Sequence, residues 1–439
     1  MAKLSTKWLA LLGGALLTAG TVFAQDSGPL IDLLVKKGIV TDQEGEQLRA
    51  DLVKDFAANS SAGKLNVSAS LSELRISGDV RVRYEYRQGQ NPTGDNVDRN
   101  RFRYRLRPTI TGQLGSDWFF GFRLENGSGA RSSNVTWSAQ GGPWAKTDDA
   151  VYVGQVYLGY RPNADWTITA GRIPNPFVNT LMVWDGDINP EGFAEQFKKT
   201  VGTSNYFMNF GQLLYDSANP QNSIAPAINR QDQYLLGWQA GATFKLNETN
   251  TIQLAPAVYN YVNNKPTSKN FAGAFSPTNL TAVNNLFVID MPFEYNFVLA
   301  GSAPSRVFGD VAYNTDGKNR ARKFGRPDLD NQVYAWQFGY QYGKAKLKGE
   351  WDAKLYYQAQ GLFSLDPNLV DSDIFDSRTN MKGLVLTANF MLTDALTFTF
   401  TAANGAAQNK TVITAGSGDI GIAQLNKFNL LMFDVVAKF

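Results

Sequence analysis

The sequence predicts an all-β protein: a transmembrane antiparallel β-barrel of about 16 strands, with 14 strands as the alternative, preceded by a short N-terminal α-helical periplasmic segment. Three observations predict this fold class. The chain begins with the pattern of a secretion signal, and from about Leu74 to the end its hydrophobicity alternates with a period of two. One of the two alternating faces is rich in charged residues, as expected for a wall that meets two different solvents.

Residues 1–24 have the pattern of a signal peptide. Lys3 and Lys7 provide the positive n-region, residues 8–17 the apolar h-region, and residues 22–24 the cleavage site. A membrane anchor is the weaker alternative, because the apolar run is short and interrupted by glycine. We therefore expect cleavage after Ala24 and delivery of the mature chain to the bacterial outer membrane.

The composition excludes several classes of function. The chain has no cysteine and no histidine, which excludes Ser-His-Asp and Cys-His nucleophilic systems and the usual zinc sites. The net charge is +3 for the whole chain and +1 without Lys3 and Lys7, so the charge does not favour a nucleic-acid partner.

Two weaker patterns of acidic residues do not support a catalytic or a calcium site. Asp185 and Glu191 could form a carboxylate pair, but the sequence offers no substrate cleft beside them. Asp310 with residues 314–317 supplies too few ligands for a calcium loop. We expect no catalytic residues, no cofactor and no metal site.

Residues 25–63 are predicted to form a periplasmic helical hairpin and linker. The first helix begins near Pro29 and ends near Gly38, and Thr41 with Glu44 forms a capping box for a second helix. One apolar stripe follows the second helix at Leu48, Leu52 and Phe56. Two short helices hardly form a core alone, so their apolar sides need either another copy of the chain or the barrel.

Residues 64–439 are predicted to form the barrel. In residues 79–87, valine and tyrosine at even positions alternate with arginine and glutamate at odd positions, and residues 101–107 and 118–125 repeat the pattern. The other segments with this alternation are 234–245, 334–342, 344–357, 384–390, 396–400 and 431–439. Many segments of about ten residues, often joined by tight turns, are typical of a transmembrane barrel.

The connections fall into two classes. Short turns are expected at 115–117, 161–163, 247–249, 343–344 and 393–394, and longer polar stretches at 128–149, 263–285, 315–330 and 364–378. The short turns match the periplasmic end of such a barrel, and the longer stretches match its extracellular end. A soluble β-sandwich or β-helix would also alternate, but it needs a second apolar face to bury the many aromatic residues.

The last strand carries an assembly signal. Leu431, Phe433, Val435, Ala437 and the terminal Phe439 share one face. This row resembles the signal that outer-membrane barrels present to the barrel-assembly machinery, and residues Phe433, Val435 and Phe439 are its main elements. Outer-membrane lipids and lipopolysaccharide are the other expected partners.

Two neighbouring motifs resemble a known family. Residues 171–177 read Gly-Arg-Ile-Pro-Asn-Pro-Phe, and residues 184–192 read Trp-Asp-Gly-Asp-Ile-Asn-Pro-Glu-Gly. They resemble the putative porin family of Gram-negative bacteria, as do the N-terminal segment LLVKKGIVT and the arginine-rich first hairpin. The resemblance implies a 16-strand-type porin fold, a passive channel and a homotrimer.

A set of basic residues falls on the polar faces of the predicted strands. The candidate pore-lining residues are Arg81, Arg83, Arg87, Arg101, Arg103, Arg105, Arg107, Arg123, Lys346 and Lys348. If the apolar residues face lipid, the guanidinium groups point into the pore, where they could pass anions along by forked hydrogen bonds. The alternative is that they pair with Glu85, Glu125, Asp117 or acidic loop residues and only line the wall.

Residues 175–195 are the candidate constriction loop. The segment contains three prolines in or beside it and is too long and irregular for a hairpin turn. Its candidate residues are Phe177, Trp184, Asp185, Asp187 and Glu191. Folded inward, the carboxylates would face the arginines across the lumen, whereas folded outward the segment would be an ordinary surface loop.

These patterns favour a passive diffusion channel for small hydrophilic solutes with a preference for anions. The alternative is a structural or adhesive barrel that presents its long loops outside the cell. A wide polar lumen distinguishes the two, because a barrel of few strands is packed shut by its own side chains.

Overall fold

The computed structural model describes residues 35–37, 41, 44, 46–47 and 70–439, except for 128–131, 139–141, 145–149, 218–231, 263–274, 300–302 and 417. The chain divides into two units, Met1–Ala69 and Ser70–Phe439. The expected signal peptide and linker lie outside the described residues. Within the described part of the chain, no helix has the length and apolar character needed to cross a membrane.

The capping box predicted in the N-terminal unit is confirmed. The backbone N–H of Thr41 donates to Glu44 Oε2 at 2.9 Å, and the backbone N–H of Glu44 donates to Thr41 Oγ1 at 3.3 Å. These two reciprocal bonds satisfy backbone donors that a helix N-terminus leaves free. Residues 35–36, 44 and 46–47 are helical, and the rest of the predicted hairpin lies outside the described residues.

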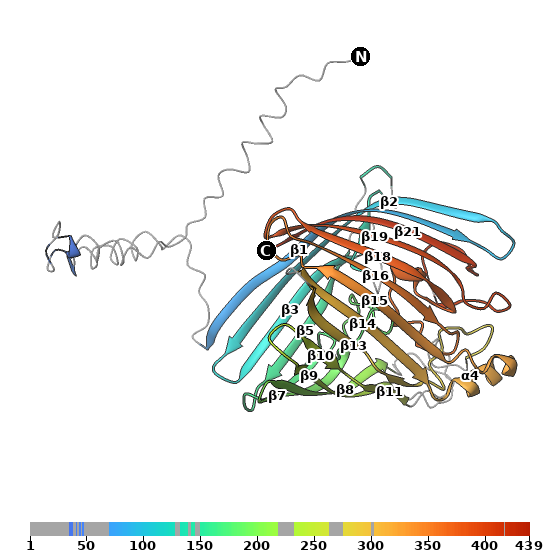
Figure 1. Ribbon diagram of the computed structural model, residues 1–439, viewed down its shortest axis with the longest axis horizontal. Coiled ribbons are helices and arrows are strands. Elements are labelled where there is room, and N and C mark those ends of the chain that lie inside the picture. Colours follow the sequence, from blue (N-terminus) through green and yellow to red (C-terminus); the bar gives the residue numbers. More distant parts are fainter. Residues whose placement is uncertain are drawn as a thin grey trace, which may run out of the picture. The chain divides into compact units, whose positions relative to one another are not determined.

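The second unit is a closed antiparallel barrel in which the described residues form 16 strands (Figure 1). Its first half contains β1 (Leu71–Gln90), β2 (Asn96–Leu114), β3 (Trp118–Gly127), β4 (Val135–Thr136), β5 (Ala150–Tyr160), β6 (Trp166–Arg172), β7 (Glu191–Val201), β8 (Ser204–Asp216) and β9 (Gln233–Lys245). Its second half contains β10 (Thr251–Leu254), β11 (Ala257–Val262), β12 (Phe287–Asp290), β13 (Phe293–Leu299), β14 (Ala303–Asn314), β15 (Tyr334–Gly343), β16 (Trp351–Gln360), β18 (Met381–Met391), β19 (Leu396–Ala407) and β21 (Lys427–Lys438).

Two barrel strands are each interrupted by a proline. Pro256 separates β10 from β11, and Pro292 separates β12 from β13, because proline lacks the N–H that a continuous ladder needs. Their carbonyl groups still accept bonds from the neighbouring strands: Ala240 N–H donates to Pro256 and Ala255 N–H donates to Pro292, both at 3.1 Å. Each pair therefore counts as one interrupted strand, and β4, which only adds two residues beside β2, is not counted among the 16.

Pairing of the first and last strands closes the barrel. β1 and β21 are antiparallel from the pair Asp79 and Lys438 to the pair Gln90 and Lys427. The backbone groups of Gly78 and Phe439 also bond to each other, at 2.9 and 3.1 Å. The terminal residue therefore lies at the seam between the two ends of the sheet.

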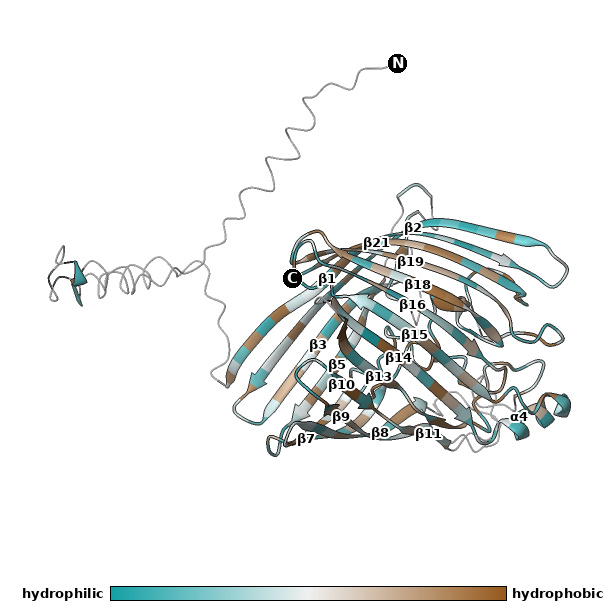
Figure 2. Cartoon of the chain, in the orientation of Figure 1, coloured by the Kyte–Doolittle hydropathy of each residue, from teal (hydrophilic) through white to brown (hydrophobic). Residues whose placement is uncertain are grey.

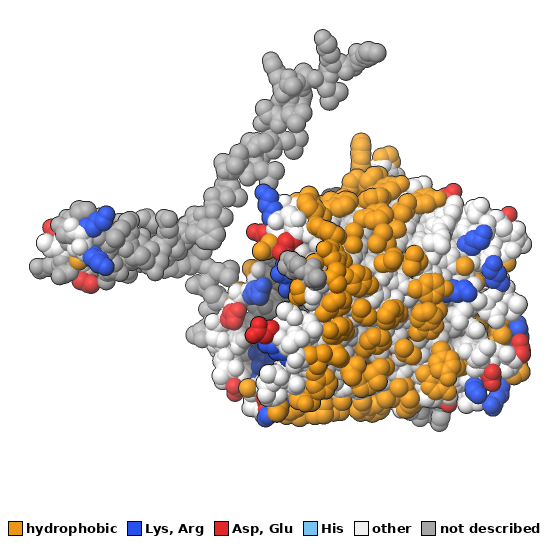
Figure 3. All heavy atoms as spheres, viewed as in Figure 1, with side chains coloured by type: hydrophobic (Ala, Val, Ile, Leu, Met, Phe, Trp, Pro, Cys, Tyr) orange, Lys and Arg blue, Asp and Glu red, His pale blue; other side chains and the backbone are white. Residues whose placement is uncertain are grey.

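The burial of the strands is inverted relative to a soluble protein. On β1 and β2, Val80 and Phe102 are 41% and 48% exposed, whereas Arg83 and Glu85 are 3% and 0% exposed. Apolar and polar residues alternate along the strands (Figure 2), and the apolar ones form a continuous band on the outer surface, with charged residues beyond both edges (Figure 3). A soluble sandwich would bury the apolar face, so that alternative is wrong.

The described connections differ at the two ends of the barrel. The predicted turns at 115–117, 161–163, 247–249 and 393–394 are confirmed as short links between consecutive strands. The other end carries the longer segments, including helix α4 (Gly317–Lys323) and the 3-10 turns η2 (Pro327–Leu329) and η3 (Ile374–Asp376). It also carries the small sheet of β17 (Arg378–Thr379) and β20 (Ala415–Gly416).

The prediction of a strand at 344–357 places the start of that strand too early in the sequence. β16 begins at Trp351, and residues 344–350 form the link from β15, with Gly343 and Gly349 at φ of 85° and 83°. The carboxylate of Glu350 accepts the N–H groups of Lys346 and Leu347, both at 2.8 Å, which closes a turn. Lys346 and Lys348 are therefore exposed turn residues at the strand ends and do not line the lumen wall, which corrects the sequence prediction.

Candidate functional site

The arginine-rich face of β1 and β2 points into the barrel. Antiparallel pairing places Arg81 opposite Arg105 and Arg83 opposite Arg103. Alternation sends their side chains to the side away from the exposed valines and phenylalanines, and all four are buried. Arg87, Arg101 and Arg107 share this face, and Arg123 from β3 lies beside it and bonds Glu125 at 3.1 Å.

Glu85 is the carboxylate at the middle of this wall. It accepts a hydrogen bond from Arg87 Nε at 2.8 Å, one from Arg101 Nε at 2.6 Å and one from Arg103 Nη1 at 3.4 Å. Arg83 Nη1 lies 3.7 Å from the same carboxylate. One negative charge is thus shared by four guanidinium groups, so the wall itself leaves a positive excess.

Four further carboxylates reduce this excess: Asp434 of β21, bonded to Arg83 at 2.6 Å, and Asp373, Asp376 and Asp419 of the long connections, with Asp376 at 3.1 Å from Arg87. Asp373 bridges Arg83 Nη1 at 2.7 Å and Arg87 Nη2 at 2.9 Å, and Asp419 contacts Arg87 Nη1 at 3.0 Å and Arg101 Nη2 at 2.7 Å. Burial alone would raise the pKa of Asp373, but the guanidinium groups of Arg83, Arg87 and Arg81 outweigh it and hold the pKa well below its usual range. Burial likewise opposes ionisation of Asp419, yet Arg87 and Arg101 lower its pKa to about 2.

The other end of the wall meets the predicted constriction loop. Asp79 accepts hydrogen bonds from Arg105 Nε at 2.9 Å and from Arg107 Nε at 2.8 Å. Arg107 Nη1 also contacts Asp187 at 3.1 Å, and Ser133 Oγ donates to the other oxygen of Asp187 at 3.0 Å. The carboxylate of Asp187 therefore reaches the arginine wall directly.

Arg81 and Arg103 are the least neutralised members of the wall. Among the described residues, Arg81 forms an ion pair only with Asp434, at 4.0 Å, and Arg103 only with Glu85, at 3.4 Å. Within the described residues, the buried Nε atoms of both arginines have no hydrogen-bond partner. These two guanidinium groups retain the capacity to bind an additional acceptor.

Residues 173–190, named here the first inward segment, connect β6 to β7 through the interior of the barrel. Gln239 on β9 donates to Val178 O at 2.7 Å, Thr180 Oγ1 donates to Asp310 on β14 at 2.5 Å, and Gln360 on β16 donates to Met182 O at 2.9 Å. The segment is thus bonded to three inward-facing wall side chains and does not form an outward surface loop.

Apolar packing fixes the same segment. Phe177 and Trp184 are buried, and the Phe177 ring lies 5.3 Å from Tyr259 in an edge-on contact. Gly211 and Gly237 on β8 and β9 make room for Phe177, because a Cβ at Gly237 would lie 2.2 Å from its ring. The predicted prolines and aromatic residues therefore act by packing against a wall that lacks side chains at this point.

The carboxyl residues predicted in this region separate into two groups. Asp185 is buried and accepts the N–H groups of Asp187 and Ser372, both at 2.9 Å. Burial, reinforced by the charge of Asp187, raises the pKa of Asp185 to about 6. Glu191 instead begins β7, is exposed, and pairs with Arg172 at 2.5 Å, so its position differs from that predicted.

Residues 361–377, named here the second inward segment, also lie inside the barrel and were expected as part of a long outer loop. Leu365, Leu369 and Val370 pack in one apolar cluster with Phe177 and Trp184. Asp185 N–H donates to Leu369 O at 2.6 Å, so the two inward segments are bonded to each other. The signal that could have revealed this segment is its series of aspartates at 366, 371, 373 and 376, which are possible partners for the arginines of the first hairpin.

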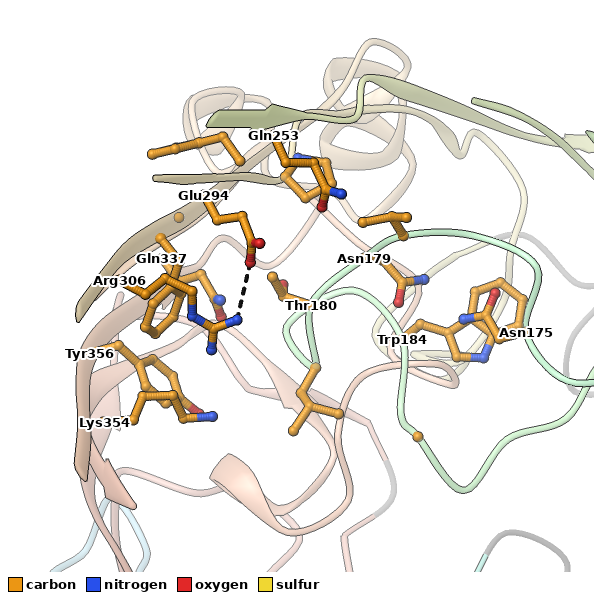
Figure 4. Close-up of a pocket in the computed structure, with 17 residues that line it drawn as sticks. Asn175, Asn179, Thr180, Trp184, Gln253, Glu294, Arg306, Gln337, Lys354 and Tyr356 are labelled. Carbon is orange, nitrogen blue, oxygen red and sulfur yellow. Dashed lines mark hydrogen bonds and ion pairs between the residues drawn. The ribbon is translucent and has the colours of Figure 1, made fainter. Parts of the chain in front are cut away.

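A cavity of about 300 Å³ lies between the first inward segment and the opposite wall (Figure 4). Asn179, Thr180 and Trp184 line it on one side. Arg306 and Lys354 lie on the other, with Arg306 bonded to Glu294 at 3.0 Å. The lumen therefore holds polar space beside the segment as well as the arginine wall.

Comparisons with known proteins agree with the predicted family. Residues 88–288 match the family described as "Putative porin". An anion-selective porin from Comamonas acidovorans is 10% identical and matches 84% of this chain and 99% of its own, with a TM-score of 0.46.

Two further solved structures match the same share of the chain. One is described as "Asymmetric conductivity of engineered proteins" and the other is a mutant of the Rh. blastica porin; both are 10% identical, matching 84% of this chain and 100% of their own, with TM-scores of 0.43 and 0.42. No curated protein matches the chain significantly.

Proposed function

We propose that this chain, whose residues 88–288 match the putative porin family, is an outer-membrane porin for passive diffusion of small hydrophilic solutes. The observation that carries the proposal is the inverted burial of the barrel, with an apolar outer band and an interior lined by charged and amide side chains. A barrel of 16 strands is too wide for its own wall residues to fill, so its lumen can hold water.

The proposed preference is for anions. Glu85 is shared by four arginines, and the Nε donors of Arg81 and Arg103 have no partner in the part of the chain that the structure describes. Carboxylates from the inward segments offset part of this charge, which corresponds to the pairing alternative considered from the sequence. The uncompensated guanidinium groups support selection of small anions such as phosphate or carboxylates, since ring-like clusters of arginine favour them in pores.

The proposed setting is the outer membrane, reached after removal of residues 1–24. The exposed side chains of Phe433, Val435 and Phe439 support recognition of the last strand by the barrel-assembly machinery. The apolar band supports contact with lipids and lipopolysaccharide, and the family resemblance supports a homotrimer.

The test is conductance of the purified, folded protein in planar bilayers. We expect stable unitary steps, and we expect liposomes that contain the protein to swell in isosmotic solutions of small neutral or anionic solutes. The absence of both from protein shown to be folded, by its heat-dependent gel mobility, would contradict the porin function and favour a structural or adhesive barrel.

A further inference from the structure

Two carboxyl groups lie in the barrel wall directly behind the first inward segment. Asp290 ends β12, Asp310 lies in β14, and each is 0% exposed. β12 and β14 are neighbours, with Asp290 opposite Ala312, so the two side chains are close along one face of the sheet. Their carboxyl groups are within hydrogen-bonding reach of each other.

The hydrogen bonds around this pair are incomplete. Asp310 Oδ2 accepts the hydroxyl of Thr180 at 2.5 Å. In the described part of the chain, Asp310 Oδ1 and both carboxyl oxygens of Asp290 are buried without a donor, and neither residue forms an ion pair with a lysine or arginine. Two adjacent buried carboxylates without a counter-charge are strongly unfavourable, because each is desolvated and each repels the other.

The surrounding groups supply no counter-charge. From β11, the hydroxyl of Tyr259 is the titratable group that faces the pair; it is buried, and its neighbour in the first inward segment is the neutral side chain of Asn179. From β15, the residue opposite Asp310 is the neutral Gln337. From the inward segment come Asn179 and Thr180, whose positions beside the cavity are visible in Figure 4. A proton between the carboxyl groups is the simplest way to remove one of the two charges and to supply a donor.

We propose that Asp290 and Asp310 share one proton, and that this pair positions the first inward segment by presenting Asp310 to Thr180. The inference rests on the proposed function in one respect, namely that the segment borders the path of solutes. Loss of the shared proton places two like charges side by side in the wall. Their repulsion separates the two side chains and moves Asp310 out of the position in which it accepts the Thr180 hydroxyl. The pair is therefore a pH-sensitive anchor of the segment.

The chain has no cysteine, which allows a test that does not depend on conductance. Leu181 follows Thr180 and is 43% exposed, so a cysteine introduced there (Leu181→Cys) reports the position of the segment through its rate of modification by a small water-soluble thiol reagent. The same substitution is made in an Asp290→Asn background, because the amide imitates the protonated acid and cannot ionise.

The quantity compared is the modification rate of Leu181→Cys divided by the modification rate of the double variant Leu181→Cys with Asp290→Asn. This ratio cancels the titration of the thiol itself, and we expect it to rise about tenfold between about pH 5 and about pH 9. Asp352→Asn is the matched control, because Asp352 is also a buried aspartate of a barrel strand, bonded to Asn389 at 2.9 Å. When Asp352→Asn is added to Leu181→Cys, the ratio of its modification rate to that of the double variant with Asp290→Asn should still rise with pH. A ratio that stays constant with pH would overturn the proposal.

Single-channel recording provides the second measurement. If the porin function holds, the mean open conductance of the wild type should change over the same pH range, and the change should vanish in Asp290→Asn. A channel that conducts with the same pH profile in both proteins would contradict the shared proton. A protein that never conducts, but shows the expected modification ratio, would contradict the porin function and leave the anchor supported. The modification rate is also measured at fixed pH with and without added CaCl2. If CaCl2 changes the rate only when Asp290 is present, a bound cation takes the place of the shared proton, which contradicts the proposal.

Discussion

Both inward segments share one apolar cluster, but their polar contacts with the barrel wall differ. Those of the first segment are mostly neutral hydrogen bonds, with Asp187 as its ion-paired residue, whereas those of the second include ion pairs of Asp373 and Asp376 with arginines of β1. Val178, Thr180 and Met182 of the first segment bond to amide or carboxyl side chains of β9, β14 and β16. Asp373 of the second segment instead lies between two arginines of β1.

This difference has a physical consequence. Packing in a crowded interior responds to changes of volume, and ion pairs that border water respond to pH and to salt. Changes in side-chain size should therefore disturb the first segment, and changes in charge should disturb the second.

The largest effect is expected from Gly237→Val. The new side chain would overlap the ring of Phe177, since even a Cβ would lie 2.2 Å from it. Overpacking of this kind costs about 1–3 kcal/mol, and it should displace the first segment and change the unitary conductance. Urea-induced unfolding and single-channel recording measure the two effects. Gly186→Ala is the control, because its Cβ would lie 3.8 Å from Leu181, and equal effects of both variants would contradict the packing role.

A smaller effect on stability, with a clear effect on selectivity, is expected from Asp373→Asn. The change removes the charge that Arg83 and Arg87 share, so the reversal potential in a KCl gradient should move toward that of chloride. The loss of stability should remain below the roughly 3–5 kcal/mol of a fully buried pair, because Asp373 is partly exposed. Asp330→Asn removes an exposed partner of Lys318 and should leave the potential unchanged.

Acid should loosen the ion-paired region. The pKa of Asp419 is lowered from 3.8 to about 2 by its arginine partners, so its contribution to stability is present above about pH 4 and is lost as pH falls toward about 2. The depressed pKa of Asp373 extends this loss to still lower pH. Thermal unfolding measured across this range should show a falling midpoint, with a smaller fall in Asp419→Asn. Identical pH profiles would contradict the ion-pair account.

The smallest effect is expected from Lys346→Gln. Lys346 is an exposed residue of the turn that precedes β16, where water and salt screen its charge. Its replacement should leave the reversal potential within experimental error of the wild type. A shift as large as that of an arginine variant would indicate that the turn borders the solute path.

The fold was largely predictable because each strand repeats one physical requirement, an apolar outer face and a polar inner one. This alternation placed the arginines of β1 and β2 on the correct face and located most of the turns. It failed at residues 344–350, since lysines alternating with Leu347 imitate a strand although Glu350 and two glycines close a turn.

The lumen was less predictable because it depends on contacts between residues far apart in sequence. Asp373 and Asp419 meet β1 and β2 across separations of several hundred residues, and Asp434 reaches Arg83 only through closure of the barrel. The proline and aromatic content of residues 175–190 did indicate an irregular segment with its own packing. Period-two alternation carries no information about which long connection folds inward.

In the proposed function, the arginine wall of β1 and β2 sets the selectivity of a water-filled channel. The most direct measurement is the reversal potential of single channels in a KCl gradient, for the wild type and for Arg103→Glu. The account predicts a wild-type potential of the sign for chloride, moved toward potassium by the substitution, because Arg103 is among the least neutralised members of the wall. A wild-type potential of the sign for potassium, or one that Arg103→Glu leaves unchanged in a conducting channel, would contradict it.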